Sequence, residues 1–353
     1  MLSFVEVGQG SGYPIVNSDL SQSVPLHHRI CLCTTTTTSR STKPWMPALN
    51  IIRNIKTKPA RTGLTSIHKH EPSRITYLIK PFGFTVLVGV SSFCGTIIWQ
   101  YETLRSYFQN AQKQAALYRH KFYGKAGSFR HSMNVWWNQL NPGRRLAAQL
   151  IAANCAVFVL WKVPRLQGVM HNYFTCSPFS KTPCLSMLLS VFSQRSLIHL
   201  TCNMVVLWSF SEPITRTWGR EQFIAFFLTA GVISSFTSYA YKVAKFSTVP
   251  SLGASGAILG LIGVICCQYP NSRLSILLVD QIYPHSFSAD SAMKGLIMFD
   301  VMGILFGWTM FDHAAHLGGM LFGIWYEKYG KALIWKRWRE PMMKRWHDLR
   351  GEP

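Results

Sequence analysis

The chain contains seven apolar stretches that carry few charges and are long enough, or nearly long enough, to cross a lipid bilayer as helices. A helix needs about 20 apolar residues to span a hydrocarbon core of about 30 Å. The stretches are Pro81–Trp99, Leu146–Trp161, Ser196–Ser211, Gln222–Tyr241, Leu252–Gln268, Ala292–Met310 and Ala314–Tyr326. Backbone polar groups cannot stay unpaired in lipid, and these runs are of helix length. The pattern therefore predicts an all-α polytopic membrane protein.

Composition supports a membrane protein over the other classes. Only 14% of residues are charged, against about 25% in a soluble domain, and a disordered chain would need lower hydrophobicity. The net charge of +22 suits phospholipid headgroups or nucleic acid. Because the basic residues flank the apolar stretches instead of forming one stripe, lipid is the better interpretation and nucleic-acid binding is not expected.

The spacing of the stretches predicts five regions. One apolar stretch stands alone and six lie close together, so we expect one transmembrane helix followed by a six-helix core. The predicted regions are a targeting or disordered basic segment at 1–80, the extra helix at 81–100, a polar basic linker at 101–145, the core at 146–330 and a basic aromatic tail at 331–353.

Residues 1–80 have the composition of a mitochondrial transit peptide, because they are basic, rich in Ser and Thr and poor in acidic residues. No Lys or Arg precedes Arg29, however, and the basic amphipathic run begins near Met46. Met46 is therefore an alternative initiator, which abundant peptides from residues 1–45 would argue against. A basic arm without a targeting role is the other interpretation.

Four polar residues lie inside the core stretches, where such side chains are costly and signal function or helix contact. His199 and Asn203 lie near the start of the second core helix, Ser255 near the start of the fourth and His316 near the start of the sixth. In a serpentine bundle the even-numbered helices start at the same membrane face. The four residues are therefore expected to meet just below one surface.

These residue types are those of a serine hydrolase. Ser255 would be the nucleophile and His316 its general base. His199, Asn203 and the free backbone N–H groups in the first turn at Ser255 would stabilise the oxyanion. No carboxylate is required to orient His316, so a Ser–His dyad would suffice. Glycines on the fourth and sixth helices, including a GxxxG at Gly319 and Gly323, would let the two helices approach closely.

Each polar residue also has a purely structural interpretation. A membrane Ser often bonds its own backbone, and a lone His often joins helices. We expect Asp300 and Lys294 to pair with each other, headgroups or bundle neighbours, and His313 to be interfacial. The sequence predicts no cofactor and no metal site, because Asp312–His316 lacks the Glu and the histidine spacing of HExxH.

Three motifs resemble the rhomboid intramembrane serine proteases. They are His199-x-x-x-Asn203, Gly253-Ala254-Ser255-Gly256 and Ala315-His316-Leu317-Gly318-Gly319. The extra helix and the segments at 311–319, 333–336 and 339–341 resemble the mitochondrial, presenilin-associated rhomboid-like branch. The resemblance covers roughly Pro81 to the end of the chain. It implies a Ser255–His316 dyad, oxyanion contacts from His199, Asn203 and the Ser255 N–H, and single-pass membrane proteins as substrates.

We therefore expect a multi-pass serine protease of the mitochondrial inner membrane, with membrane lipids as further partners. An inactive rhomboid-like escort protein and a transporter or assembly scaffold are the alternatives, and both would tolerate loss of Ser255 or His316. The orientation in the membrane stays open. If the N-terminus lies in the matrix, the basic segment at 101–145 and the basic tail lie on the opposite side of the membrane, whereas the positive-inside rule would place them in the matrix. The oligomeric state and a Cys176–Cys184 disulfide also stay open.

Overall fold

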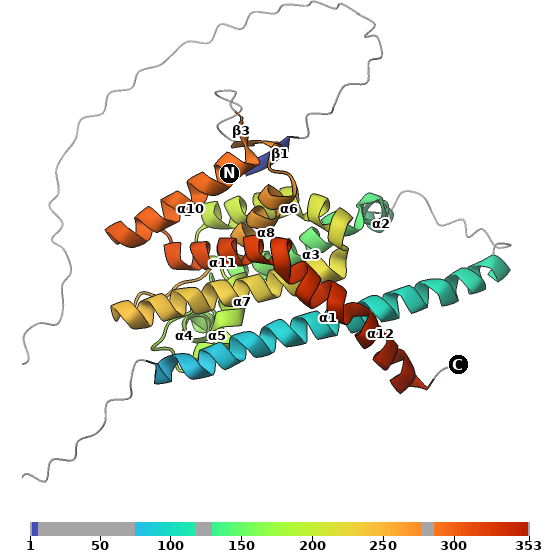
Figure 1. The fold of residues 1–353 in the computed structure, drawn as a ribbon, viewed down its shortest axis with the longest axis horizontal. Coiled ribbons are helices and arrows are strands. Elements are labelled where there is room, and N and C mark those ends of the chain that lie inside the picture. The colour runs from blue at the N-terminus through green and yellow to red at the C-terminus, as the bar shows by residue number, and fades with distance from the viewer. Residues whose placement is uncertain (1, 6–74, 118–128, 277–285, 352–353) are drawn as a thin grey trace, which may run out of the picture. The chain divides into compact units, whose positions relative to one another are not determined.

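The computed structural model describes residues 2–5, 75–117, 129–276 and 286–351, and these residues are mainly helical (Figure 1). The helices from the amino end are α1 (Thr76–Leu117), α2 (Phe129–Gln139), α3 (Pro142–Leu160), α4 (Gln167–Tyr173), α5 (Pro183–Leu189), α6 (Leu197–Trp218), α7 (Arg220–Lys245), α8 (Ser255–Gln268), α10 (Ala289–Phe306), α11 (His313–Trp325), the π-helical η3 (Tyr326–Lys336) and α12 (Arg337–Arg350). Short 3₁₀ turns η1 (Pro164–Leu166) and η2 (Ser190–Phe192) lie between α3 and α6.

Each of the seven apolar stretches forms a helix, so the predicted all-α polytopic class is confirmed. The helices are α1, α3, α6, α7, α8, α10 and α11, and two of them, α1 and α6, extend well beyond the predicted ends, to Leu117 and Trp218. Within the described ranges, three segments are long and apolar enough on their own to cross a membrane: Thr76–Asn110, Pro142–Leu160 and Arg220–Lys245. The predicted count of one plus six crossings stays a prediction.

Helix α8 lies at the centre of the core. It is apolar on all sides, and every residue from Gly256 to Cys266 is buried, as expected of a helix surrounded by others. Helices α7 and α11 pack against it, and α1 lies along the outer side of α7 (Figure 1). This arrangement places the start of α8 beside the start of α11.

An aromatic cluster holds the helices together at the end of the core away from these starts. Trp218 of α6, Phe226 of α7 and Tyr326 of η3 have ring centroids 5.1 to 5.3 Å apart, and Phe93 of α1 stacks on Tyr326 at 5.6 Å. The Tyr326 hydroxyl accepts a hydrogen bond from Gln222 Nε2 at 3.0 Å. Each buried ring of this kind contributes strongly to packing.

The predicted linker and the predicted tail both contain helices. Helix α1 continues through the expected linker to Leu117 and α2 follows within it. The predicted tail is helical in η3 and α12, and it contacts α1 through Trp346 Nε1, which donates to Glu102 Oε1 at 2.7 Å, and Arg339 Nε, which donates to Gln100 Oε1 at 2.8 Å. A polar composition is compatible with a helix outside the membrane, and these contacts stabilise it.

A small antiparallel sheet includes residues of the amino-terminal segment. Strand β1 (Leu2–Val5) pairs with β2 (Arg273–Ile276), and β2 pairs with β3 (Phe287–Ser288). Residues 2–5, which belong to the segment predicted to be targeting or disordered, thus form a strand. The remainder of the predicted targeting segment, including Met46, lies outside the described residues.

Candidate active site

The start of α8 presents Ser255. Gly253 precedes it with φ of 136°, a conformation that favours glycine, and its N–H donates to the Ser190 carbonyl at 2.9 Å. Helix α8 begins at Ser255 itself. The backbone N–H groups of this first turn therefore have no partners within the helix.

Helix α11 brings His316 to Ser255. Its N-cap is Asp312, whose Oδ1 accepts the Ala315 N–H at 3.0 Å, and His316 lies one turn later. The distance between His316 Nε2 and Ser255 Oγ is 2.9 Å. The predicted contact between the hydroxyl and the imidazole is therefore present.

Glycines allow this close approach, as the sequence predicted. A Cβ on Gly319 would overlap the backbone carbonyl of Gly256, and a Cβ on Gly323 would overlap that of Gly260. The two helices thus touch backbone to backbone along two turns.

His199 lies on the first turn of α6 and lines the same cavity as Ser255 and His316. A Cβ on Gly253 would lie 2.9 Å from His199 Cε1 and 3.6 Å from Ser255 Oγ, so the His199 ring and the Ser255 hydroxyl flank Gly253. This position is compatible with contact to a carbonyl oxygen bound near Ser255.

Asn203 is placed differently from the expectation. It is buried behind the cavity, where its Nδ2 donates to Gln194 Oε1 at 3.0 Å, and Gln194 Nε2 donates to Asn154 Oδ1 at 3.2 Å. Asn154 Nδ2 in turn donates to the Leu150 carbonyl at 2.8 Å. This chain of amides fixes the orientation of Asn203 and leaves one of its amide protons for another acceptor. Its oxyanion role stays a prediction.

The cavity that contains these residues has a volume of about 670 Å³. Ser196 and Ser251 line it, and so do aromatic and apolar side chains of the α10–α11 loop. The polar and charged residues along its wall are Ser196, His199, Lys242, Ser247, Ser251, Ser255, Thr309, Asp312, His313 and His316. Such a wall suits water, which hydrolysis requires.

Asp300 lies beside His316, and the sequence did not predict this contact. Its Oδ1 is 2.8 Å from His313 Nδ1 and 3.3 Å from His316 Nδ1. Of the partners expected for Asp300, Lys294 is not the one it contacts, because Lys294 Nζ pairs with Asp290 at 2.6 Å. The contacts of Asp300 are with neighbouring residues of the bundle, which was the other expectation for a group within the core. His313 is the first residue of α11 and is 4% exposed, so its side chain is buried within the protein. Its interfacial depth in the membrane stays a prediction.

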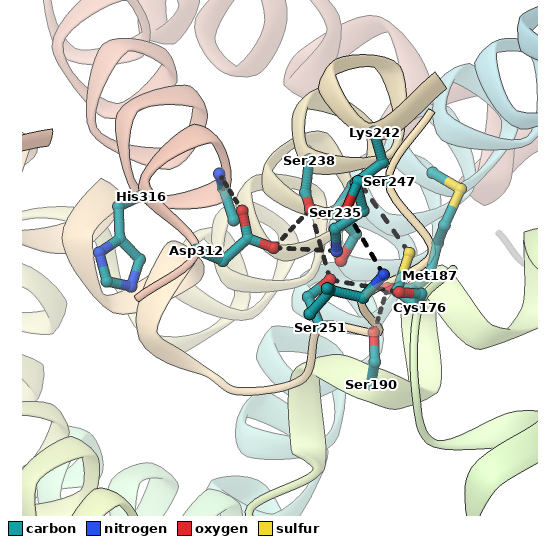
Figure 2. Close-up of polar contacts among 12 residues, drawn as sticks. Cys176, Met187, Ser190, Ser235, Ser238, Lys242, Ser247, Ser251, Asp312 and His316 are labelled. Carbon is teal, nitrogen blue, oxygen red and sulfur yellow. Dashed lines mark hydrogen bonds and ion pairs between the residues drawn. The ribbon is translucent and has the colours of Figure 1, made fainter. Parts of the chain in front are cut away.

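A polar cluster behind the site ties its parts together (Figure 2). Lys242 Nζ of α7 lies 3.2 Å from Asp312 Oδ2, and the Ser238 hydroxyl donates to the same oxygen. Ser238 Oγ is also 3.3 Å from Ser251 Oγ, and Ser251 and Cys176 exchange two backbone hydrogen bonds of 2.7 and 2.9 Å. The segment before Ser255 and the helix start before His316 are thus held by one helix, α7.

The cluster sets the charge of Asp312, which lies in the loop before α11. Burial alone would raise the pKa of its carboxyl. The Lys242 ammonium, the Ser238 hydroxyl and the Ala315 N–H outweigh burial, so the pKa lies below its ordinary value. Asp312 is therefore an ionised N-cap, which also suits the positive end of the helix dipole.

The cysteines of the first core loop are not joined. Cys176 is buried and Cys184 half-buried, and both are free thiols. Among the residues that the structure describes, no group of three or more His, Cys, Asp or Glu side chains is placed to hold a metal ion.

Comparison with known proteins agrees with this geometry. The model of the Rhomboid domain matches residues 182–331, which contain Ser255 and His316. The mouse presenilin-associated rhomboid-like protein, mitochondrial, is 48% identical over 284 residues, covering 79% of this chain and 74% of the mouse protein. The human protein of the same name is also 48% identical, over 79% of this chain and 73% of its own. This chain belongs to the rhomboid family.

More distant rhomboids match as well. Rhomboid protein 1, mitochondrial, of Saccharomyces cerevisiae is 29% identical over 218 residues, covering 61% of this chain and 62% of the yeast protein. The chain is thus a mitochondrial membrane protein of a family of intramembrane serine proteases. Within that family, the position of the hydroxyl, the imidazole and the cavity at the starts of α8 and α11 marks the candidate active site.

Proposed function

We propose that this rhomboid hydrolyses peptide bonds in or near the transmembrane helix of single-pass membrane proteins of the mitochondrial inner membrane. The observation that supports this most directly is the 2.9 Å contact between His316 Nε2 and Ser255 Oγ inside a polar cavity. A serine hydroxyl becomes a nucleophile when a base accepts its proton, and this contact has the length that such a transfer needs.

The reaction follows from these positions. Ser255 Oγ attacks the substrate carbonyl carbon while His316 Nε2 takes the hydroxyl proton. The resulting oxyanion would accept hydrogen bonds from the Ser255 backbone N–H and from His199, with Asn203 as a further proposed donor. His316 then gives its proton to the leaving amine, which breaks the peptide bond and leaves an ester on Ser255. A water from the cavity then gives a proton to His316 while its oxygen attacks the ester carbon. His316 passes this proton to Ser255 Oγ as the ester bond breaks, which releases the carboxylic acid product and restores Ser255.

The proposed function suggests a role for each predicted region of the chain. We propose that residues 1–80 contain the mitochondrial targeting sequence and that 146–330 are the protease core, with the helix at 81–100 as an additional crossing. The basic aromatic tail at 331–353 would lie at the membrane interface, where Trp and Lys or Arg are preferred. No cofactor takes part in this scheme.

The proposal is tested by measuring cleavage of a single-pass substrate by the purified protein, both reconstituted in liposomes. Wild type is expected to cleave the substrate, and Ser255→Ala and His316→Ala are each expected to lower turnover at least about 10³-fold. Unfolding temperature serves as the control for folding. Cleavage by either variant at a rate near wild type would favour the scaffold or transporter alternative. Binding of substrate without cleavage by wild type would favour an escort protein.

A further inference from the structure

The carboxylate of Asp300 is buried at a place where the dyad does not require one. The residue lies on α10 and is 2% exposed. A carboxylate removed from water is costly unless hydrogen bonds or opposite charge compensate it. The contacts recorded for Asp300 Oδ1 in the described chain are the Nδ1 atoms of His313 and His316, at 2.8 and 3.3 Å.

These contacts determine the proton positions on His316. To accept the Ser255 proton, Nε2 must carry the lone pair, so a neutral His316 must carry its proton on Nδ1. That nitrogen lies 3.3 Å from Asp300 Oδ1, within ion-pair distance. The carboxylate therefore favours the reactive tautomer and stabilises the imidazolium that forms when Ser255 attacks. At 3.3 Å the contact is longer than an ideal hydrogen bond, as is common before substrate binds.

His313 holds the carboxylate in place from the other side. Its Nδ1–H can donate to Asp300 Oδ1 at 2.8 Å, while its Nε2 is buried without a partner among the described residues. The contact with Asp300 is thus the polar interaction that fixes this ring. Aromatic rings of Phe299, Trp308 and Phe311 surround it at centroid distances of 5.2 to 6.1 Å.

A glycine on α10 leaves room for the His313 ring. Gly303 lies three residues after Asp300 on the same face of the helix, and a Cβ there would overlap the His313 ring. The glycine thereby lets the imidazole lie flat against α10 within reach of Asp300.

We propose that Asp300 and His313 are positioning residues for His316, so that the hydrolytic unit is an ordered row of Ser255, His316, Asp300 and His313. This inference rests on the proposed protease function. No bond to Asp300 or His313 forms or breaks. Their role is to hold one imidazole in the orientation and tautomer that accept a proton from Ser255.

The test measures cleavage of a single-pass substrate in liposomes as a function of pH. Asp300→Asn is expected to lower kcat about 10²-fold without changing KM. The acid limb of the kcat profile should move to lower pH, because the imidazolium loses a stabilising charge. Within the described part of the chain, the other titratable or charged groups that line the cavity with His316 are His199 and Cys202 from α6, Tyr241 and Lys242 from α7, Asp312 from the loop before α11, and His313 from α11. They are unchanged in Asp300→Asn, which therefore isolates the carboxylate.

Substitutions of His313 separate positioning from packing. His313→Asn places an amide N–H close to the position of Nδ1 and is expected to retain kcat within about 3-fold. His313→Leu keeps much of the volume but has no donor, and is expected to lower kcat as Asp300→Asn does. Asp290→Asn, the same change on an exposed part of α10, is the matched control and should leave kcat, KM and the pH profile unchanged.

The outcomes are distinct. Wild-type kcat in either Asp300→Asn or His313→Leu would overturn the inference, as would a lowered kcat with an unmoved acid limb in Asp300→Asn. If Ser255→Ala and His316→Ala are inactive in the same assay, such a result leaves the proposed function standing. If Ser255→Ala cleaves the substrate, the proposed function itself fails.

Discussion

His199 lies beside Ser255 with its ring against Gly253, so it can reach an oxygen bound at the start of α8. Such a donor matters most when negative charge develops in the transition state. His199→Ala is therefore expected to lower kcat about 10²-fold while KM stays near wild type. Steady-state cleavage kinetics measure this. The matched control is Thr201→Ala on an exposed position of the same helix, and a rise in KM with unchanged kcat for His199→Ala would contradict the assignment.

The residues of the candidate site divide by how well sequence alone predicted them. Ser255, His316 and His199 were predicted because each lies near the start of an even-numbered core helix. Asp300 was missed, although the same reasoning reaches it. It lies on the fifth core helix, which runs in the opposite direction, so the end of that helix is near the starts of the even-numbered ones. Only the six residues 307–312 separate the end of α10 from the start of α11, which agrees with that proximity.

The contact between α8 and α11 is the element-scale feature on which the dyad depends. Gly323 lies two turns beyond His316, and a Cβ there would overlap the Gly260 carbonyl. Gly323→Ala is therefore expected to lower stability by about 1–3 kcal/mol and to reduce cleavage by separating the two helices. Gly295→Ala on α10 meets no atom within 4 Å, and should be neutral or slightly stabilising. Thermal unfolding in detergent compares them, and equal unfolding temperatures would contradict this view.

The ion pair between Lys242 and Asp312 is the second element-scale feature, because it fixes the start of α11 to α7. The pair is largely buried, with side chains 8% and 21% exposed. Lys242→Met leaves the carboxylate without its counter-charge and is expected to cost about 3–5 kcal/mol. Adding Asp312→Asn to this variant should restore part of the loss, which unfolding temperatures measure. A double variant less stable than Lys242→Met would argue against the pair.

The same pair predicts how stability depends on pH. The pKa of Asp312 is lower in the folded protein than in the unfolded chain, because Lys242 and Ser238 outweigh the effect of burial. Its contribution is thus complete above the unfolded pKa of about 4 and is lost as pH falls through the lower folded pKa. Asp312 should therefore cause no loss of unfolding temperature between pH 7 and about 5.

At the scale of the whole molecule, the sequence predicted the helices because long uncharged stretches allow little else in a membrane. It did not predict that α1 extends to Leu117, since a polar charged segment is compatible with helix or loop. Nor did it predict that α12 would bind α1 through Glu102, which depends on side chains 244 residues apart. Contacts of this kind follow from tertiary packing and leave little local signal.

The position of the cavity also determines what a substrate must do. Ser255 and His316 lie in the first turns of α8 and α11, at one end of the core, beside a cavity that holds water-compatible side chains. A peptide bond that reaches Ser255 Oγ must leave the regular hydrogen bonding of a membrane helix, because the nucleophile needs access to the carbonyl carbon. Substrates whose helices unwind easily near the cut are thus expected to be cleaved best.

Covalent labelling of Ser255 by a fluorophosphonate tests the central claim most directly, because it reports on the activated hydroxyl without requiring a known substrate. Wild-type protein in liposomes is expected to carry the label on Ser255, located by peptide mass spectrometry. His316→Ala should label at least about 10²-fold more slowly, since the general base is absent. Equal rates of labelling in the two proteins, or no label on Ser255 in folded wild type, would contradict a hydroxyl activated by His316.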